Sequence, residues 1–190
     1  MKKKYLRAKY KKLRLNLTTE TIEDLSLQIA NQLLTLPIWD FSFYHLFLSI
    51  AEQKEVDTEP ILHILQGKDK NVVLPKTDAP TNELINYLLT DTTVIKKNRW
   101  NIPEPQDGII IEANKIEVVF VPLLAFDTSG HRVGYGKGFY DKFFATCQPD
   151  VLKVGLSFFE AEEKIEDTYQ SDIPLDYCVT PKNSYSFRKS

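Results

Sequence analysis

Glycine is scarce in this chain, and most of it falls in one short stretch. Only 7 of the 190 residues are glycine, and four of these lie between Gly130 and Gly138. Glycine lets the backbone adopt positive φ and leaves no Cβ in the way of a ligand. Arg132, Lys137 and Asp141 add charge to the same segment, GHRVGYGKGFYDKF. The chain therefore concentrates its backbone freedom at one charged place.

The spacing of apolar residues predicts alternating helices and strands. Helices are expected over residues 3–17, 19–36, 58–67 and 138–147, and strands over residues 43–50, 71–75, 115–122, 152–158 and 175–180. Residues 82–99 are ambiguous, with strand favoured around 84–89. Several expected strands are apolar on both faces, which is typical of buried parallel strands. We therefore expect an α/β fold, with one three-layer domain over residues 1–190 and a mainly parallel sheet flanked by helices.

The glycine stretch follows the clearest expected strand, residues 115–122, and leads into an expected helix. In α/β sheets, ligands bind at the carboxyl ends of strands. Backbone N–H groups freed by glycine, a helix N-terminus and the charges of Arg132 and Lys137 would together form a phosphate cradle. The spacing fits neither a Walker A loop nor a dinucleotide-binding loop. The alternative is a surface turn with solvated charges.

Asp141 lies in the first turn of the expected helix. A carboxylate there interacts favourably with the helix dipole. Beside bound phosphates it would instead hold Mg²⁺, which prefers one or two carboxylates together with phosphate oxygens. The residues alone favour the dipole role.

Positive charge gathers at the start of the chain. Residues 1–14 hold eight of the 24 Lys and Arg residues and no acid, whereas residues 15–190 hold all 26 acidic residues. The first segment is therefore expected to contact a polyanion. A nucleic-acid-binding module is one alternative, but the acidic remainder would repel a polyphosphate chain.

The cysteine pattern and the apolar runs indicate an intracellular protein. Cys147 and Cys178 are far apart and, with the scattered histidines, match no zinc-ligand spacing. No signal-peptide pattern and no run of ~18 apolar residues is present, so we expect a cytoplasmic protein without a membrane span.

The segment VPLLAFDTSGHRVGYGKGFYDKFF, residues 121–144, resembles the signature of the 5-formyltetrahydrofolate cyclo-ligase family, also called 5,10-methenyltetrahydrofolate synthetases. The family pattern is approximately P-x-x-x-F-D-x-x-G-x-R-x-G-x-G-x-G-x-Y-D. The matching residues are Pro122, Phe126, Asp127, Gly130, Arg132, Gly134, Gly136, Gly138, Tyr140 and Asp141. Further segments resemble family elements in the same order: KKYLR (3–7), LSIAEQKEVDT (48–58), VVLPK (72–76), RWNIPEP (99–105) and SDIPLDYCVT (171–180).

The resemblance implies a NagB/RpiA/CoA-transferase-like fold and an ATP-dependent ligase. Such an enzyme converts 5-formyltetrahydrofolate, possibly polyglutamylated, to 5,10-methenyltetrahydrofolate with ATP and Mg²⁺. We expect a monomer that binds neither nucleic acid nor membrane. A runner-up within this fold is another phosphate-ester or nucleotide enzyme that shares the glycine loop but lacks the folate pocket.

The resemblance also assigns site residues. The ATP set is Lys3, Lys4, Arg7, Arg132, Gly134, Tyr135, Gly136, Lys137, Gly138, Phe139 and Tyr140. The folate set is Leu48, Glu55, Trp100, Tyr135, Gly136, Lys137, Gly138 and Phe139. Lys137, Tyr140 and Arg132 are the expected catalytic residues, and Asp141 and Asp172 the expected Mg²⁺ ligands.

Each assignment has a structural alternative. Lys3 and Arg7 would otherwise lie on the solvated face of a basic helix, and Glu55 would be an exposed loop acid. For the apolar and aromatic members, the alternative is packing. This applies to Leu48, Tyr140 and Trp100, and Asp172 would be an ordinary loop charge.

Overall fold

The computed structural model describes residues 1–78 and 80–188. Its helices are α1 (Lys3–Leu15), α2 (Thr19–Leu33), α3 (Glu59–Gly67) and α4 (Phe139–Thr146), with 3-10 turns η1 (Ala51–Gln53) and η2 (Ala113–Lys115). Its strands are β1 (Phe43–His45), β2 (Asn71–Asp78), β3 (Glu83–Leu88), β4 (Ile95–Lys97), β5 (Pro103–Pro105), β6 (Val118–Pro122), β7 (Ala125–Phe126), β8 (Arg132–Val133), β9 (Leu152–Leu156), β10 (Tyr177–Val179) and β11 (Ser184–Ser186).

A seven-stranded sheet forms the centre of the molecule, in the order β11-β10-β9-β6-β1-β2-β3. Its five inner strands, from β10 to β2, run parallel to one another, whereas the edge strands β11 and β3 are antiparallel to their neighbours. The predicted mainly parallel α/β sheet is confirmed.

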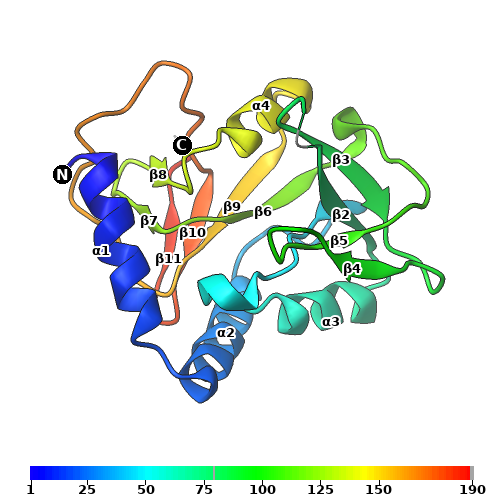
Figure 1. Ribbon diagram of the computed structural model, residues 1–190, viewed down its shortest axis with the longest axis horizontal. Helices are drawn as coiled ribbons and strands as arrows, with labels where there is room; N and C mark the ends of the chain where they lie inside the picture. Colours follow the sequence, from blue (N-terminus) through cyan, green and yellow to red (C-terminus); the bar gives the residue numbers. More distant parts are fainter. Residues whose placement is uncertain (79, 189–190) are drawn as a thin grey trace.

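Helices cover both faces of this sheet, α2 and α3 on one side and α4 on the other (Figure 1). The side chains of β6 alternate accordingly. Val118 and Phe120 pack in the cluster that includes α2 and α3, whereas Val119 and Val121 pack in the cluster that includes α4. This two-sided burial explains why the strand is apolar without interruption in the sequence.

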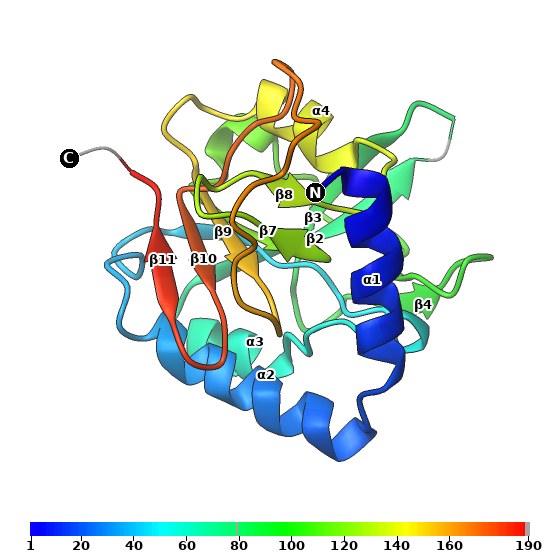
Figure 2. The same ribbon diagram turned by 90° about the vertical axis from the view of Figure 1, so that its left-hand side faces the viewer.

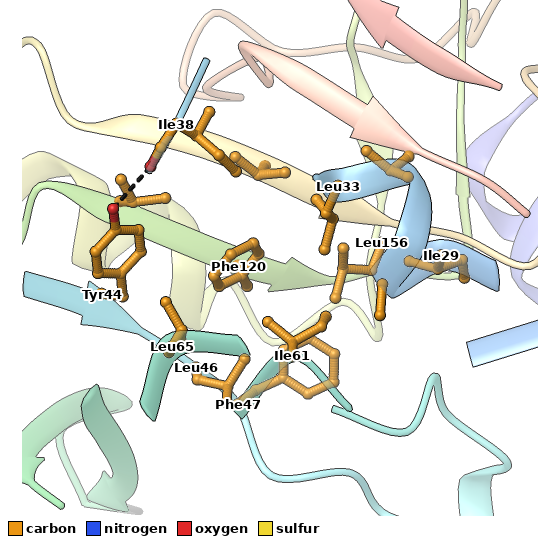
Figure 3. Close-up of a cluster of buried hydrophobic side chains, with 14 of the residues drawn as sticks. Ile29, Leu33, Ile38, Tyr44, Leu46, Phe47, Ile61, Leu65, Phe120 and Leu156 are labelled. Carbon is orange, nitrogen blue, oxygen red and sulfur yellow. Dashed lines mark hydrogen bonds between the residues drawn. The ribbon is translucent and has the colours of Figure 1, made fainter. Parts of the chain in front are cut away.

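The larger cluster lies between the sheet and the helices α2 and α3. Figure 3 shows Phe120 and Leu156 from the sheet beside Leu33 and Ile61 from these helices. The Tyr44 hydroxyl, buried in the same cluster, donates to the Ile38 carbonyl at 2.8 Å, so this buried polar group has its partner.

Helix α1 stands apart from these layers, against the β7–β8 hairpin (Figure 2). Leu6 and Tyr10 of α1 pack on Ala125 and Val133 of the hairpin. The turn of the hairpin is closed by the buried Asp127, whose carboxylate accepts the N–H groups of nearby backbone. The chain thus reaches the glycine segment through a rigid hairpin that α1 covers.

Two features differ from the sequence prediction. The expected strand over residues 43–50 ends at His45, and the following apolar residues leave the sheet. The hairpins β4–β5 and β7–β8 and the edge strand β11 were not expected.

In the described ranges, none of the helices is long and apolar enough to cross a membrane.

Candidate active site

A cavity of about 870 Å³ opens at the carboxyl ends of the parallel strands. Residues that follow β1 and residues at the ends of β2 and β6 line it, with α1, the glycine loop, α4 and the β4–β5 hairpin. Its volume is in the range of small-molecule sites, which measure ~300–1,000 Å³. This cavity lies at the position that the sequence predicted for a ligand site.

One face of α1 supplies basic side chains to this cavity. Lys3, Arg7 and Lys11 line it at helical spacing, and Arg14 lies behind the wall, 3% exposed. Lys3 is also buried, so the solvated-face alternative is wrong for it. The expected Lys4 is exposed and is outside the described residues that line the cavity, because the helix turns it away.

Arg7 lies directly on the glycine loop. Its Nε donates to the Gly134 carbonyl at 2.9 Å. At Gly136, where φ is +93°, a Cβ would lie 3.3 Å from the Arg7 guanidinium carbon. A side chain here would be strained by the backbone and crowded by Arg7, so the packing of α1 on the loop requires glycine.

Arg132 is inside the site rather than solvated. Its side chain is 8% exposed and forms an ion pair with Asp141 at 2.6 Å. It also donates to the Ile173 carbonyl. The alternative of a surface turn with solvated charges is therefore wrong for Arg132, whereas Lys137 is exposed.

The two expected metal ligands lie near each other and each is held by a cation. Asp172 accepts from Lys3 Nζ at 2.5 Å, and the N–H of the next residue, Ile173, donates to Asp141 at 3.3 Å. Burial raises the pKa of Asp172, but the hydrogen bonds from Lys3 and the Tyr169 N–H outweigh it and lower the pKa below its ordinary value. The carboxylate of Asp172 is thus available as an anion.

The residues fit a metal only in company with a ligand. Among residues 1–78 and 80–188, no group of three or more His, Cys, Asp or Glu side chains is arranged to hold an ion. Mg²⁺ accepts one or two carboxylates when phosphate oxygens and water complete its octahedron. Asp141 and Asp172 provide that number of carboxylates.

Glu55 also lines the cavity and is buried, so the loop-acid alternative is wrong. Its Oε2 accepts the Ile50 N–H at 2.8 Å and its Oε1 accepts the Tyr135 hydroxyl at 2.7 Å. Burial raises the pKa of Glu55, and the hydrogen bonds from Ile50 and Tyr135, with the charge of Arg14, oppose that rise. A buried carboxylate with acceptor capacity to spare suits a ligand that donates several N–H groups.

Trp100 and Leu48 line the cavity from separate segments. Trp100 is 42% exposed, so the core-aromatic alternative is wrong. Lys137 Nζ lies 5.3 Å from the centre of its ring, on the approach to the glycine loop. Leu48 also packs against the main core, as the packing alternative predicted.

Tyr140 likewise lines the cavity and packs on other rings. It contacts His45 edge-on, with ring centroids 5.7 Å apart, and also Phe143 and Phe144. Burial raises the pKa of Tyr140, so the hydroxyl stays neutral and is a hydrogen-bond donor. Burial lowers the pKa of His45 to about 3, which keeps the imidazole uncharged beneath it.

The chain is similar in sequence and in structure to known proteins. Residues 1–181 match the model of the 5-formyltetrahydrofolate cyclo-ligase family. The 5-formyltetrahydrofolate cyclo-ligase of Escherichia coli K12 is 30% identical over 179 residues, which cover 90% of this chain and 96% of the relative. The NMR structure of the Aquifex aeolicus 5,10-methenyltetrahydrofolate synthetase is 31% identical, has a TM-score of 0.84, and is matched over 100% of this chain and 95% of its own.

The chain belongs to the 5-formyltetrahydrofolate cyclo-ligase family.

A further relative of the same name, from Haemophilus influenzae, is 29% identical over 92% of this chain and 95% of its own length. The similarity therefore spans both the basic helix α1 and the glycine loop. The resemblance inferred from the motifs is confirmed.

The cavity of this family member also has lining residues that the sequence did not single out. Lys11 places its Nζ 5.6 Å from the centre of the Tyr135 ring, and Arg99 stacks on Trp100 at 4.1 Å. Arg14 donates to the Tyr135 hydroxyl at 3.0 Å. The spacing of positions 3, 7, 11 and 14 on one helical face was the available signal for Lys11 and Arg14. Arg99 had no such signal.

We predict that Gly136→Ala lowers the free energy of unfolding by about 1–3 kcal/mol, because alanine is strained at this positive φ and meets Arg7. Chemical denaturation measures the change. The control is Gly67→Ala at the end of α3, where no described atom lies within 4 Å of the new Cβ. Equal effects of the two substitutions would contradict the proposed strain.

We predict that Glu55→Gln changes how stability depends on pH. Because the pKa of Glu55 is raised, the folded protein keeps this proton at pH values where the unfolded chain has lost it. The free energy of unfolding therefore falls as the pH rises from the ordinary carboxyl value through the raised one. Glu55→Gln should remove this fall in denaturation curves recorded across pH.

Glu162→Gln is the matched control for this profile. Burial on its own would raise the pKa of Glu162, but hydrogen bonds from Lys9 and Tyr10 hold that pKa below its ordinary value. This carboxylate therefore adds stability that is lost as the pH falls, the opposite sign to Glu55. An unchanged profile in Glu55→Gln would mean that Glu55 is not the raised group.

Proposed function

We propose that this chain catalyses the ATP-dependent conversion of 5-formyltetrahydrofolate to 5,10-methenyltetrahydrofolate, releasing ADP and phosphate. Membership of the family supports the reaction. The observation that carries it is the cavity itself, whose lining combines a cluster of cations with the buried carboxylate of Glu55. The cations would bind a polyphosphate, and the carboxylate would bind a nitrogen-rich ring system.

The chemistry requires both ligands in one cavity. The N5-formyl group is amide-like, so its carbon is a poor electrophile. Transfer of the γ-phosphoryl group to the formyl oxygen converts that oxygen into part of a leaving group. N10 then attacks the formyl carbon, the ring closes, and the C–O bond breaks with release of inorganic phosphate. Positioning and charge stabilisation supply most of the catalysis in such a transfer.

We assign the phosphates of ATP to the cationic side. Lys3 and Arg7 from α1 and Arg132 from β8 would contact them, with Lys137 at the transferring group. The backbone of residues 134–140 would complete the cradle. Lys11 belongs to this set by position, and the exposed Lys4 is left out of it.

Asp141 and Asp172 would hold the Mg²⁺ that accompanies ATP. When bound, the ion neutralises charge on the phosphate oxygens. In the protein alone, Arg132 and Lys3 compensate these two carboxylates. Once Mg²⁺ is bound to the carboxylates, the same two cations would be free to contact the phosphates.

We assign the pterin to the side of Glu55. The carboxylate would accept the amino and ring N–H groups, and Leu48 and Trp100 would contact the flat ring. Tyr135 and Phe139 of the loop would lie between pterin and nucleotide. Tyr140, a neutral donor in the cavity, would orient the substrate near N10.

We further infer a cytoplasmic monomer that binds neither nucleic acid nor membrane. The inward direction of Lys3, Arg7 and Arg14 supports the absence of nucleic-acid binding, because these cations of α1 are turned inward and not to a polyanion outside. Binding to heparin or mixed oligonucleotides, followed across salt, tests it. A steep loss of binding with salt would favour a nucleic-acid module.

The first experiment mixes the protein with 5-formyltetrahydrofolate, ATP and Mg²⁺ and follows the near-ultraviolet absorbance of the methenyl product. We expect a rise that requires ATP. A flat trace from folded protein that still binds ATP would remove the folate assignment and keep the phosphate cradle, which points to another phosphoryl acceptor.

Site variants test the assignments. We expect Lys137→Ala and Asp141→Asn each to lower kcat/KM about a hundredfold or more, the scale seen when one charge-stabilising group is lost. Lys142→Ala is the control, because Lys142 lies one turn along α4, outside the described lining residues, and donates to the Thr81 carbonyl. Normal turnover in either site variant would remove that residue from the site.

A further inference from the structure

Three residues from distant segments form a chain of hydrogen bonds in the cavity wall. Arg14 of α1 donates from Nη1 to the Tyr135 hydroxyl at 3.0 Å, and that hydroxyl donates to Glu55 Oε1 at 2.7 Å. Arg14 is 3% exposed and Glu55 is 4% exposed. The chain therefore runs from a buried guanidinium through the half-buried phenol of Tyr135 to a buried carboxylate.

The Arg14 end of this chain is fixed independently. Its other terminal nitrogen, Nη2, donates to the Leu123 carbonyl in the segment after β6. Its Nε is buried and has no hydrogen-bond partner within the described part of the chain. A buried guanidinium with an unused donor is costly unless its charge has a counterpart. The nearby counterpart is the carboxylate of Glu55, whose charge it reaches through Tyr135.

The Tyr135 link is also fixed from both sides. Arg7, two turns before Arg14 on the same face of α1, bonds to the Gly134 carbonyl and covers Gly136. The residues on either side of Tyr135 are thus held by one arginine while its hydroxyl is held by another. The phenol has little freedom to leave Glu55.

The Glu55 end is rigid as well. Lys54, at φ 48°, places Glu55 after the η1 turn. Its Nζ donates to the carbonyls of Leu15, the last residue of α1, and of Leu17 just beyond it. The Ile50 N–H holds the second carboxylate oxygen. Each oxygen has thus accepted one hydrogen bond, and a carboxylate has room for about four.

We propose that Arg14, acting through the Tyr135 hydroxyl, is a positioning residue that fixes the Glu55 carboxylate for the ring N–H groups of the substrate. This rests on the proposed function for the identity of the substrate. Arg14 touches neither substrate nor nucleotide in this scheme. Its effect reaches the cavity only through Tyr135.

The ionisation of Glu55 is part of this role, because the carboxylate offers two acceptor oxygens, whereas protonation turns one of them into a donor. Burial raises the pKa of Glu55, whereas the hydrogen bond from Tyr135 and the charge of Arg14 lower it. Lys11 and Arg7 of α1, Tyr140 of α4 and Lys54 of the adjoining turn are the other titratable or charged groups near this wall. Removal of the Tyr135 hydroxyl therefore raises the pKa of Glu55 further.

The first test needs no ligand. Carboxyl ¹³C NMR of the protein, with the Glu55 signal assigned through Glu55→Gln, follows its titration in wild type and in Tyr135→Phe. We expect a higher midpoint in Tyr135→Phe. The matched control is Tyr10→Phe, which removes another tyrosine hydroxyl bonded to a glutamate, Glu162, at 2.6 Å outside the cavity. An unshifted midpoint in Tyr135→Phe would overturn the proposal whatever the substrate is.

The second test measures binding by titration calorimetry. We expect Tyr135→Phe to weaken binding of 5-formyltetrahydrofolate about tenfold at neutral pH, the loss typical of one hydrogen bond to a charged group. The difference from wild type should narrow as the pH is raised, because Glu55 regains its charge. A loss that is the same at every pH would indicate packing alone and overturn the proposal.

Two substitutions of Arg14 that differ in charge test its role. Arg14→Lys keeps a positive charge near Tyr135 and should retain more folate affinity than Arg14→Met, with ATP affinity retained in both. Equal folate affinity in the two folded variants would overturn the role of the charge. If Arg14→Met does not fold, Arg14→Lys is compared with wild type, and an unchanged pH profile of folate binding would be contrary to the proposal. Failure of wild type to convert 5-formyltetrahydrofolate would instead refute the proposed function, and the titration of Glu55 would still decide the role of Tyr135.

Discussion

The contact between α1 and the glycine loop is the constraint on which the cavity depends. Arg7 lies against the backbone at Gly136, at a separation that leaves no room for a Cβ without displacement. The helix can approach this closely only because the loop has almost no side-chain bulk there. The approach brings one face of a basic helix to the carboxyl ends of the parallel strands, where the loop backbone faces the same cavity.

This contact also explains how so many charges are tolerated inside one wall. An isolated buried charge is expensive, so each buried cation needs an anion or a backbone oxygen. Lys3 is paired with Asp172 and Arg132 with Asp141, whereas Arg14 reaches Glu55 through Tyr135. The partners come from segments far apart in the chain. The site is therefore complete only where α1, the glycine loop and the segment before β10 are packed together.

The elements that could be predicted from the sequence are those whose signal is local. The strand β6 and the helices α1 and α2 have apolar spacing that their burial confirms. Prediction failed where the tertiary structure decides the outcome. In the apolar run after His45, Phe47, Leu48 and Ile50 line the cavity and are not part of a strand. The strand β5 was missed because it begins and ends with proline, which is depleted in strands.

The same distinction separates the site residues. Arg132 and Lys137 stand beside the glycines, so their role in the cavity could be predicted from neighbouring positions. Asp172 could not be found this way, because its partner Lys3 lies at the other end of the chain and neither residue is unusual alone. Arg14 was missed for a related reason, since a basic residue on an amphipathic helix is ordinarily solvated. Its burial becomes intelligible only when Tyr135 and Glu55 are placed beside it. Some features of this chain contradict local rules, such as clustered glycine in a glycine-poor chain and charge on a buried helix face. These features therefore mark the candidate site in the sequence.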